Sequence, residues 1–488
     1  MLKKQENCGM LIIDEDKDVQ EMKNKRCGGC QKQSCDDCRL FLRQKLHTDK
    51  EIAGNLAIKI TERPKKAVGI AFDVGTTTVA ASLWNLNTGE CMGALSSANP
   101  QRCKGNDVVS RIAYCMENET EHTRELQGMI TECMDMLAEK LLQEYQVQEP
   151  VSHAIVVGNT AMCRLALGVS VSGLAKAPFK KGYTGCVVKQ GRDMGLQVLE
   201  SAKVTILPAI EGYVGADALA VYTYVKKMGA GENSLIVDIG TNGEILFIGK
   251  NGVYTCSTAA GPALEGAAVQ CGMSASAGAI AGIRLAGSFP GEDIFLEVIG
   301  DTLPKGICGS GLLDAMALLY KEKLLSADGY LKTEREAAKD GAGVRLCKRL
   351  QTVEGENRFV LKDGADPVYL TGRDIRQLQL AKGAIRAGME TLLQKEKLTV
   401  EEIDSIYLAG AFGNYIRPES AVAIGLLPQV GTEKIIPIGN GAGLGAAMAL
   451  LSEEIVNEMV LLSEKIVHVE LAREKVFEEL FPEYMNLP

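Results

Sequence analysis

Two short stretches of the sequence place a carboxylate beside a turn that could bind an anion. The first is residues 68–84, VGIAFDVGTTTVAASLW, and the second is residues 235–248, LIVDIGTNGEILFI. In each stretch an apolar strand reaches one aspartate, Asp73 or Asp238, and a turn leads into a second strand. The turn residues are Gly75, Thr76, Thr77, Gly240, Thr241 and Asn242. Because such turns leave N–H groups and hydroxyls free to face an anion, two of them predict two halves that close on one phosphate chain.

A second kind of chemistry is predicted by a cysteine run near the N-terminus. Cys27, Cys30, Cys35 and Cys38 form a C-x2-C-x4-C-x2-C pattern, and four thiolates so close together suit a soft metal centre. Zinc sites built from four cysteines usually separate the two pairs by more residues, so we favour an iron–sulfur cluster over zinc. The spacing differs from the plant-type ferredoxin run, which favours [4Fe–4S] over [2Fe–2S]. Cys8 is either a fifth candidate ligand or a bystander.

Composition limits the classes of partner. The chain has 488 residues, 46% of them hydrophobic, and a net charge of −9, which argues against nucleic acid or an anionic membrane as a partner. The N-terminus lacks the apolar core of a secretion signal, and no apolar run reaches spanning length. Fifteen cysteines without such a signal indicate reduced thiols. We therefore expect a cytoplasmic protein.

Similar elements are predicted around both turns. In each half a β-hairpin, a further strand and a helix follow in the same order, which predicts an α/β protein built from two related halves. A helix is expected over residues 129–145, where apolar side chains recur every three or four positions, and another begins at the capping box of Thr371 and Asp374. The expected divisions are a Cys-rich iron–sulfur module at 1–47, a linker at 48–67, a first half at 68–228 and a second half at 229–488.

Four further glycine-rich turns stand at the ends of strands or the starts of helices, where glycine permits close backbone approach. They are Gly158-Asn159-Thr160, Gly261 to Gly266 with Glu265, Gly410-Ala411-Phe412-Gly413-Asn414, and Gly441-Ala442-Gly443. The sequence contains no P-loop, no dinucleotide-binding glycine fingerprint before a helix, no G-x-S-x-G and no H-E-x-x-H. The four histidines have no ligand spacing. These absences argue against P-loop, Rossmann and hydrolase chemistry.

Five of these motifs together resemble a known superfamily in type and order. They match the two phosphate, two connecting and one adenosine motifs of the actin, sugar kinase and heat-shock ATPase superfamily, abbreviated ASKHA. The matching motifs are Asp73-x-Gly75-Thr76-Thr77, Gly158-Asn159-Thr160, Asp238-x-Gly240-Thr241, Gly410-Ala411-Phe412-Gly413 and Gly441-x-Gly443-x-Gly445. The resemblance implies two ribonuclease H-like (actin-like ATPase) halves, here preceded by a small Cys-rich metal-binding module.

Within that superfamily the chain is most similar to the reductive activators of corrinoid proteins, over about residues 68 to 487. The stretches that resemble this family are 99–101 with 105–112, 261–266, 308–311 and 378–385. Those activators usually carry a plant-type [2Fe–2S] ferredoxin domain at the N-terminus, for which this chain is too short. The Cys run either does the same job with a different cluster, or the electron comes from elsewhere.

The resemblance implies a site for Mg²⁺ and ATP between the halves. Asp73 and Asp238 would hold Mg²⁺ through its hydration shell, and Thr76, Thr77 and Thr241 would take phosphate oxygens. Asn159 or Glu265 would orient the attacking water, and the sequence does not rank them. Gly158, Gly240 and Asn242 would belong to the connecting and phosphate turns. Gly410, Ala411, Gly413 and Asn414 would lie along the adenosine, and Gly441 and Gly443 would be further cofactor-binding residues.

The implied function is ATP-dependent reduction of a cobalt(II) corrinoid protein of a methyltransferase system to cobalt(I). An electron donor such as a ferredoxin or flavodoxin would serve as a second partner, and the family resemblance also points to homodimers. Three alternatives stay open at the level of sequence: a small-molecule kinase of the same fold, an activator of a 2-hydroxyacyl-CoA dehydratase, and an actin-like assembly protein. The kinase and the assembly protein leave the Cys run unexplained.

Overall fold

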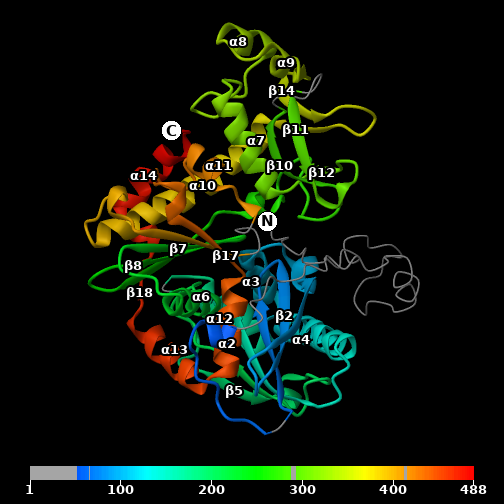
Figure 1. Ribbon diagram of the computed structural model, residues 1–488, viewed down its shortest axis with the longest axis vertical. Coiled ribbons are helices and arrows are strands. Elements are labelled where there is room, and N and C mark those ends of the chain that lie inside the picture. The colour runs from blue at the N-terminus through cyan, green and yellow to red at the C-terminus, as the bar shows by residue number, and fades with distance from the viewer. Residues whose placement is uncertain (1–51, 65, 178, 287–292, 411–414) are drawn as a thin grey trace, which may run out of the picture. The chain divides into compact units, whose positions relative to one another are not determined.

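The computed structural model describes residues 52–64, 66–177, 179–286, 293–410 and 415–488. The Cys run and its predicted module lie outside the described residues, and so do Ala411, Gly413 and Asn414. The described chain folds around two six-stranded mixed sheets accompanied by helices (Figure 1). No helix in these ranges is long and apolar enough to cross a membrane.

The first sheet has the strand order β3-β2-β1-β4-β6-β5. Its first three strands form antiparallel hairpins, whereas β4 and β6 run parallel to β1. The strands are β1 (Val68–Val74), β2 (Thr78–Asn85), β3 (Cys91–Ala98), β4 (Val151–Gly158), β5 (Val187–Gln190) and β6 (Lys203–Ile206). The helices of this half are α3 (Val108–Glu117), α4 (Glu119–Glu144), α5 (Thr160–Ala166) and α6 (Ala216–Lys227).

The second sheet has the order β17-β16-β7-β8-β9-β18 and repeats five strands of the first, whereas its sixth strand, β18, lies beside β9 and not beside β17. Strands β7, β8 and β9 form antiparallel hairpins, and β16 and β17 run parallel to β7, as β4 and β6 do to β1. The strands are β7 (Ser234–Ile239), β8 (Gly243–Ile248), β9 (Val253–Thr258), β16 (Ser405–Ala409), β17 (Ile435–Gly439) and β18 (Val467–His468). The duplication predicted from the two aspartate turns is therefore confirmed at the level of the sheets.

A long insertion separates β9 from β16. It contains two small sheets, β11-β10-β12 and β13-β14-β15. Their strands are β10 (Ala279–Leu285), β11 (Ile294–Val298), β12 (Gly306–Ile307), β13 (Leu350–Val353), β14 (Glu356–Lys362) and β15 (Val368–Thr371).

The helices that follow β9 lie partly inside this insertion and partly after it. Those inside it are α7 (Gly309–Lys321), α8 (Glu334–Lys339), α9 (Val344–Cys347) and α10 (Gly372–Lys395). Those after β16 are α11 (Pro418–Ala423), α12 (Gly441–Leu451), α13 (Glu453–Lys465) and α14 (Lys475–Met485).

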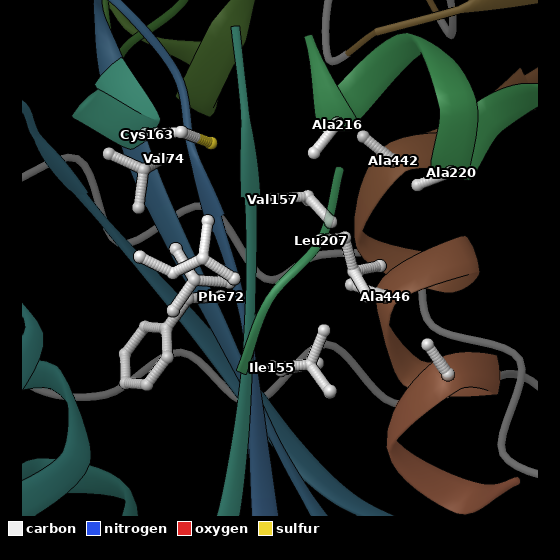
Figure 2. Packing of buried hydrophobic residues seen from close by; sticks show 14 of the residues in the cluster. Phe72, Val74, Ile155, Val157, Cys163, Leu207, Ala216, Ala220, Ala442 and Ala446 are labelled. Atoms are coloured by element: carbon white, nitrogen blue, oxygen red, sulfur yellow. The ribbon is translucent and has the colours of Figure 1, made fainter. Parts of the chain in front are cut away.

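Helices α6 and α12 pack against each other and against the central strands of the first sheet. Figure 2 shows Ile155 and Val157 on β4 pointing toward small side chains of these helices, among them Ala216 and Ala446. Alternate residues of the second sheet, such as Ile236 and Leu246, join the same core, whereas their neighbours belong to a second core with α7 and α10. Helix α12, which belongs to the second half by sequence, thus packs on the first half.

Two sequence expectations change in extent. Helix α4 begins at Glu119, ten residues before the predicted start, because its first turns are too polar to show an apolar period. The expected linker is packed from Ile52 on. Ile52 in α2 (Ile52–Asn55) is fully buried, and Thr61 N–H donates to Leu451 O at 2.9 Å. The capping box of Thr371 and Asp374 at the start of α10 is confirmed.

Candidate functional site

Asp73 and Asp238 occupy equivalent places, one residue before the ends of β1 and β7. Burial raises the pKa of Asp73 to about 6, an effect partly offset by a hydrogen bond from the Asn440 side chain. Burial and the nearby charge of Asp73 raise the pKa of Asp238 to about 7. The charge of Asp73 acts on Asp238 because the fold brings the two predicted turns together.

The hydroxyls of the two turns meet directly. Thr77 Oγ1 and Thr241 Oγ1 lie 3.1 Å apart, although they are separated by 164 residues in the chain. Both hydroxyls donate to Glu265 Oε2, Thr77 at 2.8 Å and Thr241 at 3.0 Å. Glu265 ends a short 3-10 turn (Pro262–Glu265) between two left-handed glycines, Gly261 and Gly266. Burial raises the pKa of its carboxyl. An anionic oxygen is therefore already held between the two turns.

Asn159 lies beside the first turn and is fixed at both ends of its amide. Its Nδ2 donates to Thr76 Oγ1 at 2.9 Å, while its Oδ1 accepts from Met162 N–H at 3.0 Å as the N-cap of α5. Gly158 precedes it, and a Cβ on Gly158 would lie 2.5 Å from Val74 O. The turn of residues 158–160 therefore packs directly against the end of β1.

The glycines of the second half also support the site. Gly240 N–H donates to Asn242 O at 3.0 Å and closes the β7-β8 turn. Gly410 has φ +90°, and a Cβ there would lie 2.6 Å from Asp238 Oδ1, so the end of β16 approaches the aspartate closely. Gly441 and Gly443 form the first turn of α12, where Gly443 N–H donates to Asn440 Oδ1 at 2.7 Å.

Three residues at the site were not predicted from the sequence. Asn440 caps α12 and hydrogen-bonds Asp73. Asp217, in the first turn of α6, and Glu244, opposite Asp238 across the β7-β8 hairpin, are both buried enough that the pKa of each carboxyl lies above its usual range. The charges of Asp73 and Asp238 add to the effect on Asp217. The hairpin register could have placed Glu244, because residues 238 and 244 flank the predicted turn symmetrically.

Glu244 is buried and the three aspartates are half-buried, so these carboxylates together favour a cation at the site. Asp73, Asp238, Asp217 and Glu244 supply only oxygen donors, which suit Mg²⁺ rather than a soft metal. Among the described residues, however, no three His, Cys, Asp or Glu side chains are arranged to hold a metal ion by themselves. The donor set fits Mg²⁺, which prefers oxygen ligands and usually keeps several of its waters.

Two family models match the chain in succession. One, described as the RACo middle region, matches residues 68–228, and one, described as the C-terminal domain of RACo, the ASKHA domain, matches residues 232–488. The solved structure of a reductive activator for corrinoid, iron-sulfur protein matches with a TM-score of 0.76 and 31% identity, covering 88% of this chain and 67% of that chain. The described fold is thus a mixed α/β fold of the ASKHA type.

Two characterised relatives match along most of the chain. The corrinoid activation enzyme RamQ of Eubacterium limosum is 34% identical over 444 residues, which cover 88% of this chain and 72% of RamQ. The [Co(II) methylated amine-specific corrinoid protein] reductase of Methanosarcina barkeri is 25% identical over 443 residues, covering 85% and 76% of the two chains. From these matches and the fold, the chain belongs to the RACo family of reductive activators of corrinoid proteins.

Proposed function

We propose that the chain binds Mg²⁺ and ATP between its two aspartate turns and uses ATP hydrolysis to drive reduction of a cobalt(II) corrinoid protein to cobalt(I). The observation that carries the proposal is the meeting of Thr77 and Thr241, whose hydroxyls lie 3.1 Å apart and share Glu265. Two turns that jointly hold one anionic oxygen can jointly hold a phosphate oxygen. The relatives named above act in corrinoid activation, which supports the choice of partner.

The groups around the two aspartate turns would then each contact the phosphates, the metal ion or the adenosine. The hydroxyls of Thr76, Thr77 and Thr241 and the turn N–H groups would take phosphate oxygens, as fixed dipoles that need no rearrangement during the reaction. Mg²⁺ would offset the negative charge of the phosphates. Asp73 and Asp238 would hold its water shell. Gly410, Gly441 and Gly443, with Ala411, Gly413 and Asn414, would lie along the adenosine.

Glu265 is our choice for the group that orients the attacking water. The amide of Asn159 is already committed at both ends, to Thr76 and to the N-terminus of α5. Glu265 Oε2, by contrast, accepts from two hydroxyls that phosphate would claim, which would free the carboxylate beside the terminal phosphate. Its raised pKa brings it closer to the working range of a general base.

The electron would pass through the N-terminal Cys run. Cys27, Cys30, Cys35 and Cys38 would hold a [4Fe–4S] cluster, which would supply one electron to the partner's cobalt. A low-potential ferredoxin or flavodoxin would return that electron to the cluster. A potential gap of about 200 mV for one electron corresponds to ~5 kcal/mol, comparable with the ~5.5 kcal/mol that moves a two-state equilibrium from 1:99 to 99:1. Closure of the cleft around ATP could therefore supply the driving force.

The test is carried out on full-length protein purified without oxygen. A cobalt(II) corrinoid protein and a chemical reductant are added, and ATP hydrolysis and cobalt(I) absorbance are followed together. We expect both signals to require ATP and the corrinoid protein. Glu265→Gln should lower kcat by roughly a hundredfold or more, with the Kd for ATP little changed, whereas Glu232→Gln, an exposed control, should behave as wild type.

Two outcomes would contradict the proposal. An ATP hydrolysis rate that ignores corrinoid proteins, together with phosphate transfer to a sugar or acid, would favour a small-molecule kinase. Cobalt(I) formation at the same rate without ATP would show that the cleft does not drive the electron transfer.

A further inference from the structure

Arg111 is a fully buried cation that the proposed ATP site does not yet explain. It lies on the inner face of α3 and is 0% exposed. Its guanidinium donates to the carbonyls of Thr76 at 2.5 Å and Gly105 at 3.0 Å, and to Gln101 Oε1 at 3.1 Å. It also contacts Met162 Sδ at 3.1 Å. No carboxylate in the described part of the chain forms an ion pair with it, which is costly for a buried charge.

Arg111 and Asn99 together hold the three carbonyls of the first phosphate turn. Asn99 Nδ2 donates to Gly75 O at 2.8 Å, Arg111 donates to Thr76 O, and Asn99 N–H donates to Thr77 O at 2.8 Å. The donors are Asn99, the N-cap of η3 (Pro100–Lys104), and Arg111 on α3, and the bond to Thr77 O continues the pairing of β2 with β3. The turn is thus tied down along its whole length.

The geometry of the peptide bond determines how these hydrogen bonds orient the N–H groups of the turn. In a trans peptide the C=O of one residue and the N–H of the next point in opposite directions. Tying the carbonyls of Gly75 and Thr76 behind the turn therefore directs the N–H groups of Thr76 and Thr77 away from α3. Successive N–H groups that point the same way form an anion-binding concavity. The positive charge of Arg111 behind the turn adds to the attraction for an anion.

We propose that Arg111 is a positioning residue for the phosphates of the nucleotide: it fixes the turn of Gly75 to Thr77 so that its N–H groups face the phosphate chain, and its own charge is balanced when that chain binds. This inference rests on the proposed function, because it assumes that ATP is the ligand. It gives a physical role to residues 99–101 and 105–112, which the sequence singled out without assigning them any chemistry.

The test compares two ligands that differ only in phosphate. Binding of ATP with Mg²⁺, and of adenosine, is measured by calorimetry on the full chain. Arg111→Met should weaken ATP binding by about tenfold or more, as expected for lost charge-assisted hydrogen bonds. Adenosine binding should stay within about twofold of wild type, because adenosine does not reach the turn. Arg111→Lys keeps the charge and most of the volume but lacks the fork, so its loss of ATP affinity should be smaller.

Arg164→Met is the matched control. Arg164 is also a buried arginine of the first half, and it donates to Lys180 O at 2.9 Å without contacting the phosphate turn. The Arg164→Met variant should bind ATP and adenosine with wild-type affinity even if its melting temperature is lower. Equal loss of ATP and adenosine binding in folded Arg111→Lys, or unchanged ATP binding, would overturn the positioning role alone. A wild-type protein that binds no ATP would overturn the proposed function and this inference with it.

Discussion

Asp73 and Asp238 make the stability of the folded protein depend on its ligand. Each carboxylate lies in a buried strand end, and the fold around Asp238 supplies a second carboxylate, Asp73, in place of a cation. Removing water from a charge is costly unless an opposite charge replaces it. The two carboxylates therefore destabilise the ligand-free protein. The same negative charges attract Mg²⁺ together with phosphate.

Ligand-free Asp238→Asn protein should be more stable than wild type near pH 8 and about equally stable near pH 4. Burial raises the folded-state pKa of Asp238 to about 7. At pH values between the pKa of Asp238 in the unfolded chain and about 7, the folded state binds more protons than the unfolded state. The free energy of unfolding therefore falls as pH rises through this range. The loss is complete above about pH 7 and should be on the order of 4 kcal/mol, because the pKa rises from 3.8 to about 7 on folding. Thermal unfolding of both proteins across this pH range measures the difference.

The same variant provides its own control with ligand present. With Mg²⁺ and ATP added, wild type should become the more stable protein, because asparagine cannot hold the hydrated cation as a carboxylate does. If the ligand-free variant is the less stable protein near pH 8, the assigned pKa direction is wrong.

At the scale of elements, the close approach of α6 and α12 joins the end of the chain to the first half. The helices present small side chains to each other, Ala220 on α6 and Gly445 on α12 among them, and a Cβ on Gly445 would lie 2.1 Å from Ala220 O. The capping residue Asn440 at the start of α12 contacts Asp73 through a hydrogen bond. The packing of α12 thus positions a residue of the ATP site.

Gly445→Ala should destabilise the protein by about 1 to 3 kcal/mol, because the added methyl meets a backbone atom and the two helices must separate. We expect weaker ATP binding as well, since α12 carries Asn440. Gly128→Ala is the control: Gly128 lies within α4 with open space around it, and alanine there should stabilise the helix by about 0.5 to 1 kcal/mol. Urea unfolding of the three proteins gives both values, and a neutral Gly445→Ala would contradict the close packing.

At the scale of the whole molecule, the two sheets are built alike but the chain does not divide into two independent halves. The hairpin, parallel-strand pattern of β1 to β6 is repeated by β7 to β17. Helices α12 and α13 belong to the second half by sequence but share a core with the first sheet, and residues 52–64 contact α12 through the hydrogen bond from Thr61 to Leu451. Residues 52–64 therefore pack on a helix from the second half that lies in the core of the first sheet.

Cys30→Ser should lower the iron bound per chain and remove cobalt(I) formation, with the Kd for ATP unchanged, if the Cys run and the ATP site are separate modules. Anaerobic iron analysis, visible absorbance and calorimetry on the same sample measure all three. Cys186→Ser, in the first half, should retain wild-type iron. Conversely, Asp73→Ala should abolish ATP turnover and leave the visible spectrum intact. Loss of both properties in either variant would show that the modules depend on each other.

The duplicated aspartate turns, the hairpins that carry them and the capped start of α10 could be predicted from the sequence, because hairpins, caps and apolar periodicity depend on residues close together in the chain. Contacts between distant segments could not be predicted in this way: Thr77 and Thr241 both donate to Glu265, while Asp217, Glu244 and Asn440 join the site, and α12 packs on the first sheet. Those contacts join segments up to several hundred residues apart, and they depend on which buried faces fit together rather than on any local pattern. Arg111 illustrates the difference. Its motif can be recognised in the sequence, but the role proposed for it depends on hydrogen bonds from Arg111 and Asn99 to the three carbonyls of one turn.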